Sequence, residues 1–86
     1  MKDLGYNVIV LDKGFVYVGA CRRDEDLLYM DNARNITRWG TTEGLHQIVN
    51  GGPTKNTSLT PASNVRVPWH AVISLHTTER KLWEKK

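Results

Sequence analysis

Apolar residues in the first third of the chain alternate with the two-residue period of β-strands. Residues 6–11 are rich in β-branched side chains and lead into an Asp-Lys-Gly turn at residues 12–14, where glycine permits a positive φ. Residues 15–20 form the returning strand, and residues 27–30 begin a third strand after a charged segment. The pattern predicts an antiparallel meander of three strands.

Later segments mix shorter strand signals with turn residues. Residues 32–38 are predicted to form a turn and a fourth, more polar strand. Residues 53–64 make a long loop rich in Pro, Ser, Thr and Asn, and such loops often carry function. Residues 65–67 and 69–77 are predicted strands separated by Pro68, which has no N–H to donate. Alternate residues of the last segment are expected to share one face: Trp69, Ala71, Ile73 and Leu75.

A change to helical period occurs over residues 42–50. The apolar residues there fall at i, i+3 and i+4: Leu45, Ile48 and Val49. Thr41 or Thr42 is expected to cap the start of this short helix, and a Gly-Gly-Pro stop follows at residues 51–53. The predicted fold is mainly β (α+β): a small antiparallel sheet or partly open barrel of five to six strands with one short helix. It forms a single domain, residues 1–86.

The predicted strands are apolar on both faces, since Phe15 and Tyr17 alternate with Val16 and Val18. A sheet with one solvated face would alternate apolar with polar residues. A helix of about nine residues is only ~14 Å long and is expected to leave part of a second face uncovered. We therefore expect a homo-oligomer, with a small closed barrel as the alternative. In the charged tail, Leu82 and Trp83 either dock on the domain or serve a contact.

Composition narrows the classes of function. A single cysteine, Cys21, excludes an internal disulfide, and the three histidines provide no paired ligand spacing for structural zinc. We expect Cys21 to be a packing residue, and we expect no metal or cofactor. The apolar stretches are far shorter than the ~20 residues of a membrane helix, so a cytoplasmic protein without membrane contact is predicted.

The net charge of +3 is concentrated in the middle of the chain. Residues 32–70 contain four arginines or lysines and one glutamate, whereas bases and acids balance elsewhere. This excess is too small for the broad basic face of a duplex-binding protein, but it is enough for a pocket that accepts one or two phosphates. Arg22 and Arg23 precede three acidic residues at 24–26, which are expected to neutralise them.

The start of the predicted helix is the best candidate binding site. A helix start offers unpaired N–H groups and a partial positive charge to a phosphate. Arginines would add bidentate contacts and a tryptophan could stack on a base. The candidate ligand-binding residues come from this region, from the polar face of the helix and from the 53–64 loop: Arg34, Arg38, Trp39, Thr41, Thr42, His46, Lys55 and Asn56. A capped helix with solvated arginines and a solvated histidine is the alternative interpretation.

Histidine positions give a weaker case for catalysis. His76-Thr77-Thr78 matches the His-x-Thr element of two-histidine phosphoesterases, which use two such elements as acid and base. Only one copy is present here, and a second would have to come from a neighbouring subunit. His70 and His76 lie on one strand face ~20 Å apart at the usual rise, too far apart to share a ligand. We predict no catalytic residue.

A series of motifs covers nearly the whole chain. It begins with Val-x-x-Gly (Val16 to Gly19), Leu28 and the segment Asn-Ala-Arg at residues 32–34. It continues with Trp39-Gly40 and with Leu45, Gln47, Ile48 and Gly51, and it ends with a strand near Thr77. In this order the motifs resemble those of an uncharacterised family of small phage and prophage proteins. The chain differs at Gly40-Thr41-Thr42, where the family tends to have Ser-Gly-Ala. It also has Ser74-Leu75-His76 where Glu-Ile is common.

The resemblance implies a phage protein acting in the cytoplasm of an infected bacterial host. By type, though not by sequence, a small oligomer with a basic pocket is similar to phage proteins that sequester nucleotide immune signals. Our hypothesis is therefore a non-enzymatic anti-defence protein that binds a cyclic oligonucleotide or an ADP-ribose derivative. The alternatives are a phosphodiesterase using His76 or His46, an inhibitor or accessory protein acting by protein–protein contact, and a single-strand nucleic-acid binder.

Overall fold

The computed structural model describes residues 1–84, which form one antiparallel sheet and two short helices. The strands are β1 (Lys2–Leu11), β2 (Val16–Asp24), β3 (Leu27–Arg38), β4 (Ser58–Leu59), β5 (Ser63–Pro68) and β6 (Val72–Thr77). The helices are α1 (Leu45–Gly51) and α2 (Arg80–Trp83), and two 3₁₀ turns are η1 (Asp12–Gly14) and η2 (Trp69–Ala71). The mainly β prediction with a short helix is confirmed.

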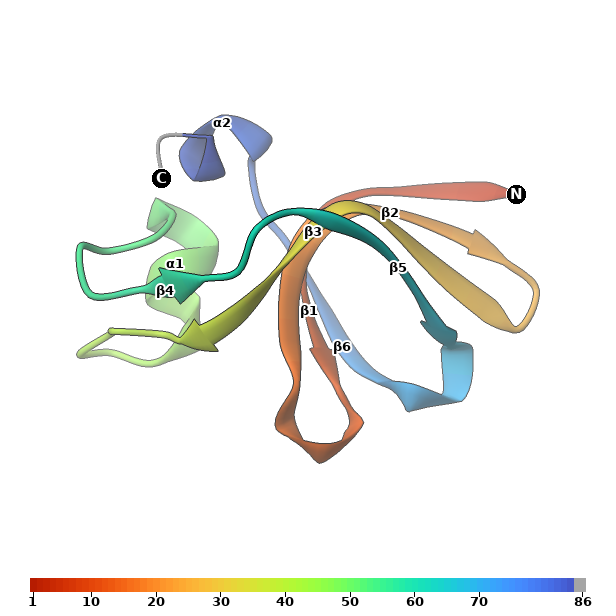
Figure 1. Cartoon of the computed structure of the whole chain (residues 1–86), viewed down its shortest axis with the longest axis horizontal. Helices are drawn as coiled ribbons and strands as arrows, with labels where there is room; N and C mark the ends of the chain where they lie inside the picture. The colour runs from red at the N-terminus through yellow and green to blue at the C-terminus, as the bar shows by residue number, and fades with distance from the viewer. Residues whose placement is uncertain (85–86) are drawn as a thin grey trace.

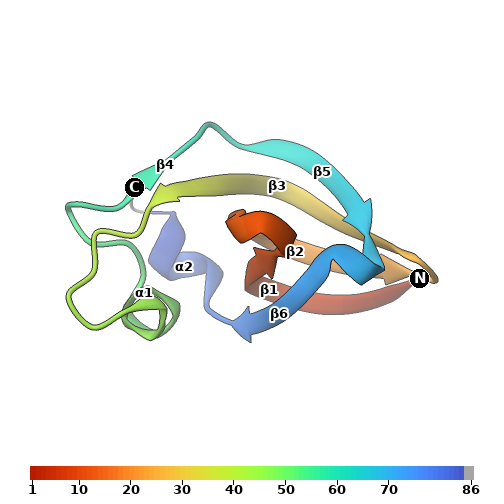
Figure 2. The same ribbon diagram turned by 90° about the horizontal axis from the view of Figure 1, so that it is seen from below.

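The sheet curls because its last two long strands pair with opposite edges. Its order is β4-β3-β2-β1-β6, and β5 pairs with β3 beside β4. Only η2 separates β5 from β6 along the chain, so the edge at β3 must approach the edge at β1. Figures 1 and 2 show β5 and β6 on opposite sides of the curled sheet, meeting at the η2 turn. The result is an open, curled sheet.

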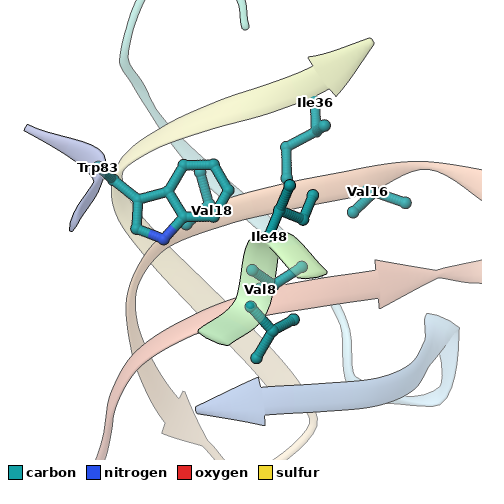
Figure 3. Packing of buried hydrophobic residues seen from close by; sticks show 7 residues of the cluster. Val8, Val16, Val18, Ile36, Ile48 and Trp83 are labelled. Carbon is teal, nitrogen blue, oxygen red and sulfur yellow. The ribbon is translucent and has the colours of Figure 1, made fainter. Parts of the chain in front are cut away.

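One face of the sheet is covered by the two helices. The buried residues of this helix-side cluster are Val8, Val16, Val18, Ile36, Ile48, Val49 and Trp83. Ile48 from α1 and Trp83 from α2 pack on the strand valines, as Figure 3 shows. The indole of Trp83 is only 2% exposed, so the charged tail docks through this side chain. We call this side of the sheet the helix-side face.

The opposite face is covered by the strands themselves. This strand-side cluster contains Ile9, Leu11, Cys21, Leu28, Met30 and Ala33. The curl of the sheet brings β5, η2 and β6 over this cluster. Their side chains pack against the cluster, among them Val67, Trp69 and Leu75. A single chain thus covers most of both apolar faces. The sequence analysis expected one short helix to leave part of a second face uncovered; α2 and the curl of the sheet, which it did not foresee, add to the cover.

The predicted break after residue 30 is wrong, since β3 runs on to Arg38. Asn32 adopts a positive φ of 52°, and its N–H donates to Asn64 Oδ1 at 3.0 Å. The pairing register of β3 with β5 shifts at this point, between Met30 and Ala33. The turn and fourth strand predicted over residues 32–38 are therefore an irregularity and the second half of one continuous strand.

Two further boundaries differ from prediction. The helix begins at Leu45, after Gly44 with a φ of 89°, and no side chain caps that position. The predicted strand over residues 69–77 is interrupted because η2 occupies its first three residues. Ile73 is then 66% exposed, at a register shift between β1 and β6. The expected alternation over residues 69–77 therefore fails at Ile73.

Candidate functional site

A hollow of about 410 Å³ lies on the helix-side face, beyond the helices. It is lined by Arg22, Tyr29, Asp31, Asn64, Val65 and Arg66. The strand register assembles it: Arg22 of β2 lies opposite Tyr29 of β3, and Tyr29 lies opposite Arg66 of β5. Directly paired residues in antiparallel strands point to the same face, so three neighbouring strands present two arginines and a tyrosine side by side.

Arg22 is held in place by three groups. Its Nε and Nη2 donate to the two carboxylate oxygens of Asp31 at 2.8 and 3.1 Å. Its Nη1 lies 3.2 Å from Met1 Sδ, and its guanidinium carbon lies 5.6 Å from the Tyr29 ring centroid. The hydrogen bonds to Asp31 raise the pKa of Arg22 above its usual value. Because the pair is solvent-exposed, it orients the guanidinium more than it stabilises the fold.

Arg66 is the second cation of the hollow. It is exposed, and within residues 1–84 its guanidinium has no ion pair. An arginine in this setting can donate two parallel hydrogen bonds to a phosphate or carboxylate. The Tyr29 ring can pack against a planar group. The hollow therefore has the chemistry to hold a planar ligand that carries an anion.

Four of the residues predicted to bind the ligand gather at another end of the molecule. Arg38 is the last residue of β3 and pairs with Ser58 of β4. Trp39, which is 39% exposed, follows it in the chain, and its carbonyl accepts a hydrogen bond from the Thr57 hydroxyl at 2.5 Å. That bond brings the 53–57 segment, with exposed Lys55 and Asn56, beside Trp39.

The amides near the start of α1 already have an acceptor. The N–H groups of Thr42 and Glu43 both donate to Gln47 Oε1 at 3.0 Å, and the Thr42 hydroxyl lies 3.4 Å from the same oxygen. Thr41 lies in the same loop, partly exposed. The predicted capping of the helix by Thr41 or Thr42 is wrong: Gly44 is the N-cap residue, without a side-chain cap, and Gln47 bonds the loop before it. A phosphate held at this place would rely on side chains such as Arg38 and not on these two amides.

Arg34 and His46 contact residues outside the predicted set. Arg34 donates from Nε to the Thr60 carbonyl at 2.9 Å. His46 of α1 contacts His76 of β6 edge to face, with ring centroids 5.8 Å apart. The Ser74 hydroxyl lies 2.9 Å from His76 Nε2. The structure therefore joins two histidines that the sequence offered as separate candidates.

The hollow was missed because sequence neighbours were assigned as the partners of Arg22 and Arg23. Arg22 instead forms its ion pair with Asp31 on the neighbouring strand, nine residues later in the sequence. Arg23 donates to the Glu25 carbonyl, and its guanidinium lies 3.9 Å from the Trp69 ring centroid. A pattern in the sequence could have indicated the hollow. Polar residues alternate in two strand segments and therefore share a face in each: Tyr29 and Asp31, and Asn64 and Arg66.

Cys21 is a packing residue, as predicted. It is fully buried, and burial raises the pKa of its thiol to about 11. No three His, Cys, Asp or Glu side chains within residues 1–84 come together as metal ligands. In the same part of the chain, no helix has the length and apolar character needed to cross a membrane.

Fold and hollow together define a small curled β-domain with a basic and aromatic surface on one face. Comparisons of the chain with protein-family models, with curated proteins and with solved structures gave no match.

Proposed function

We propose that this protein binds a phosphate-bearing nucleotide without cleaving it. The observation that carries the proposal is the hollow, where Tyr29 lies between Arg22 and Arg66 in one cross-strand row. A base can pack on the aromatic and guanidinium surface while a phosphate meets Arg66. In the phage setting expected from the sequence, such binding would withhold a cyclic oligonucleotide or ADP-ribose signal from its receptor. Sequestration of this kind needs affinity alone.

The test is a thermal-shift and calorimetry panel of AMP, ADP-ribose and cyclic di-AMP. We expect at least one to bind, and Arg66→Ala to weaken it about tenfold or more, because one arginine–phosphate contact is lost. Lys81→Ala is the matched control, since Lys81 is an exposed cation on α2 that pairs with Glu79. Arg38→Ala tests the loop end at Trp39. Failure of all three ligands to bind would contradict the proposal.

Self-association stays a separate prediction. Ligand capture in the hollow uses residues of one chain and does not depend on it. The exposed apolar residues near the β1–β2 turn and on β6 are Phe15 and Ile73, at 54% and 66% exposure. Sedimentation at micromolar concentration tests the prediction: a homo-oligomer gives a multiple of 9.8 kDa, and a single chain at all concentrations overturns it.

Ligand cleavage is a second candidate function, favoured by the contact between His46 and His76. Two imidazoles can act as general acid and general base, and Ser74 hydrogen-bonds one of them. The protein would be incubated with cyclic di-AMP, heat-denatured, and the nucleotide recovered and analysed. Loss of cleavage in His76→Ala, but not in His70→Ala, is the expected result. Quantitative recovery of intact nucleotide after overnight incubation excludes this function for that substrate.

A further inference from the structure

A second tyrosine–arginine pair lies on the same face as the hollow. The guanidinium carbon of Arg80, on α2, is 5.1 Å from the Tyr6 ring centroid. In the hollow, Arg22 lies over Tyr29 in a similar way, at 5.6 Å. Both arginines are exposed. Each pair thus offers an arginine, backed by an aromatic ring, to which a base can stack.

The strand register places the two pairs on one continuous surface. Tyr6 lies opposite Ala20, and Ala20 opposite Asp31. Arg22 is two residues beyond Ala20 on the same strand and therefore on the same face. Ala20, between the two pairs, adds only a methyl group. From the usual strand spacing and rise, the Cα atoms of Tyr6 and Tyr29 lie about 12 Å apart.

Charged groups of both signs surround Tyr6. Burial has the largest effect on the pKa of Tyr6 and raises it, Arg80 and Arg34 lower it, and the Glu84 carboxylate raises it. Of the two arginines, Arg80 lies over the ring itself. Four arginines lie along this face from β5 to α2, and the described carboxylates beside them include those of Asp31 and Glu84: the arginines are Arg22, Arg34, Arg66 and Arg80. A ligand with several phosphates complements this distribution better than a single phosphate does.

We infer that this face binds a short single-stranded oligonucleotide of about two to four nucleotides, with one base at the Arg22–Tyr29 pair and another at the Arg80–Tyr6 pair. Neighbouring nucleotides in a stacked strand are separated by a rise of about 3.4 Å. The distance of about 12 Å between the two tyrosines is several times larger, so one nucleotide cannot contact both pairs. The inference rests on the proposed function and specifies its ligand class. A linear strand and a cyclic oligonucleotide share this chemistry.

The experiment is a length series at fixed salt, measured by calorimetry: AMP, the dinucleotide pApA, the tetranucleotide of adenosine, and cyclic di-AMP. We expect the tetranucleotide to bind at least tenfold more tightly than AMP, because a second stack is added. Arg80→Ala should abolish that gain, so that this variant binds the tetranucleotide about as tightly as it binds AMP. Arg80→Lys, which keeps the charge and loses the planar group, should recover only part of it. Lys81→Ala, on the same helix, should keep the whole gain.

The outcomes separate the two proposals. If AMP binds as tightly as every longer ligand, the nucleotide function stands and the oligonucleotide inference is overturned. A length gain that persists in Arg80→Ala also overturns the inference, because the second stack would lie elsewhere. If no ligand binds, both fail. Preference for cyclic di-AMP over pApA, lost in Arg80→Ala, supports the inference and identifies a cyclic source; the reverse preference identifies a linear one.

Discussion

The Thr78 hydroxyl connects the end of the sheet to both helices. It donates to the Val49 carbonyl at 2.6 Å and accepts from Trp83 Nε1 at 3.1 Å. Val49 lies in the last turn of α1, where carbonyls have no partner within the helix. The indole N–H of Trp83 is buried and would have no water to bond. One hydroxyl therefore satisfies two buried groups on different elements.

Replacing that hydroxyl should be costly. We expect Thr78→Val to lower the free energy of unfolding by about 2 kcal/mol, because two buried polar groups lose their partner. Thr78→Ser keeps the hydroxyl and should cost about 1 kcal/mol or less, for the lost methyl group. Urea denaturation followed by circular dichroism measures both. Equal losses in the two variants would show that the hydrogen bonds contribute nothing.

The buried thiol of Cys21 should react slowly. With its pKa raised to about 11 by burial, roughly a thousandth of the folded protein carries the thiolate at pH 8. We expect alkylation by iodoacetamide to be at least about a hundredfold slower than in urea-unfolded chain, where the thiol has its ordinary pKa. The rate should rise about tenfold for each pH unit up to about 11. Rapid alkylation of folded protein at pH 8 would contradict this.

The same shift has a consequence for stability. Because the pKa of Cys21 is higher in the folded protein, folding favours the protonated thiol. The thiol's contribution to the free energy of unfolding is complete below the unfolded pKa of about 8.5 and is lost as pH rises towards about 11. Over that range, the free energy of unfolding should fall more steeply in the unmodified protein than in Cys21→Ala. Parallel pH profiles for the two proteins would be inconsistent with a raised pKa.

At the scale of elements, the end of α1 sets how closely α2 approaches. Gly52 has a φ of 81° and donates its N–H to the Ile48 carbonyl at 2.8 Å. A Cβ there would lie 2.8 Å from the Leu82 carbonyl oxygen, on α2. Gly51, the last helical residue, has open space around its Cβ position. The two adjacent glycines therefore have different constraints.

This difference makes a matched pair of variants. Gly52→Ala should destabilise the protein by about 1–3 kcal/mol, since the residue would be strained and would collide with α2. Gly51→Ala should be neutral or stabilise by up to about 1 kcal/mol through helix propensity. Thermal and urea unfolding of both variants measure the effect. Equal stability of the two would mean that α2 moves away without cost.

For the molecule as a whole, the helix-side cluster joins both helices to the sheet. Trp83 is its largest buried side chain. We expect Trp83→Ala to lower the free energy of unfolding by about 3–5 kcal/mol, a large part of the total for a domain of this size. Trp83→Phe keeps most of the packing and should lose less. An unfolding midpoint of Trp83→Ala within about 2 °C of the unmodified protein would contradict this role.

Local pattern was sufficient for the first half of the fold. Alternation in residues 6–11, 15–20 and 27–30 predicted the meander, and helical spacing at Leu45 and Ile48 predicted a helix. These features depend on neighbours within a few positions, such as glycine in a hairpin turn or apolar residues on one helix face. The mainly β class and the packing role of Cys21 followed from the same information.

Only the tertiary structure decided the rest, because it depends on which distant segments pair. Pairing with β2 and β5 carries β3 past Asn32, and the curl of the sheet with α2 covers both of its faces. The hollow joins residues from 22 to 66 through strand register, and the histidine contact joins α1 to β6. A one-residue slip in register would turn these side chains to the other face, so no local pattern could specify them.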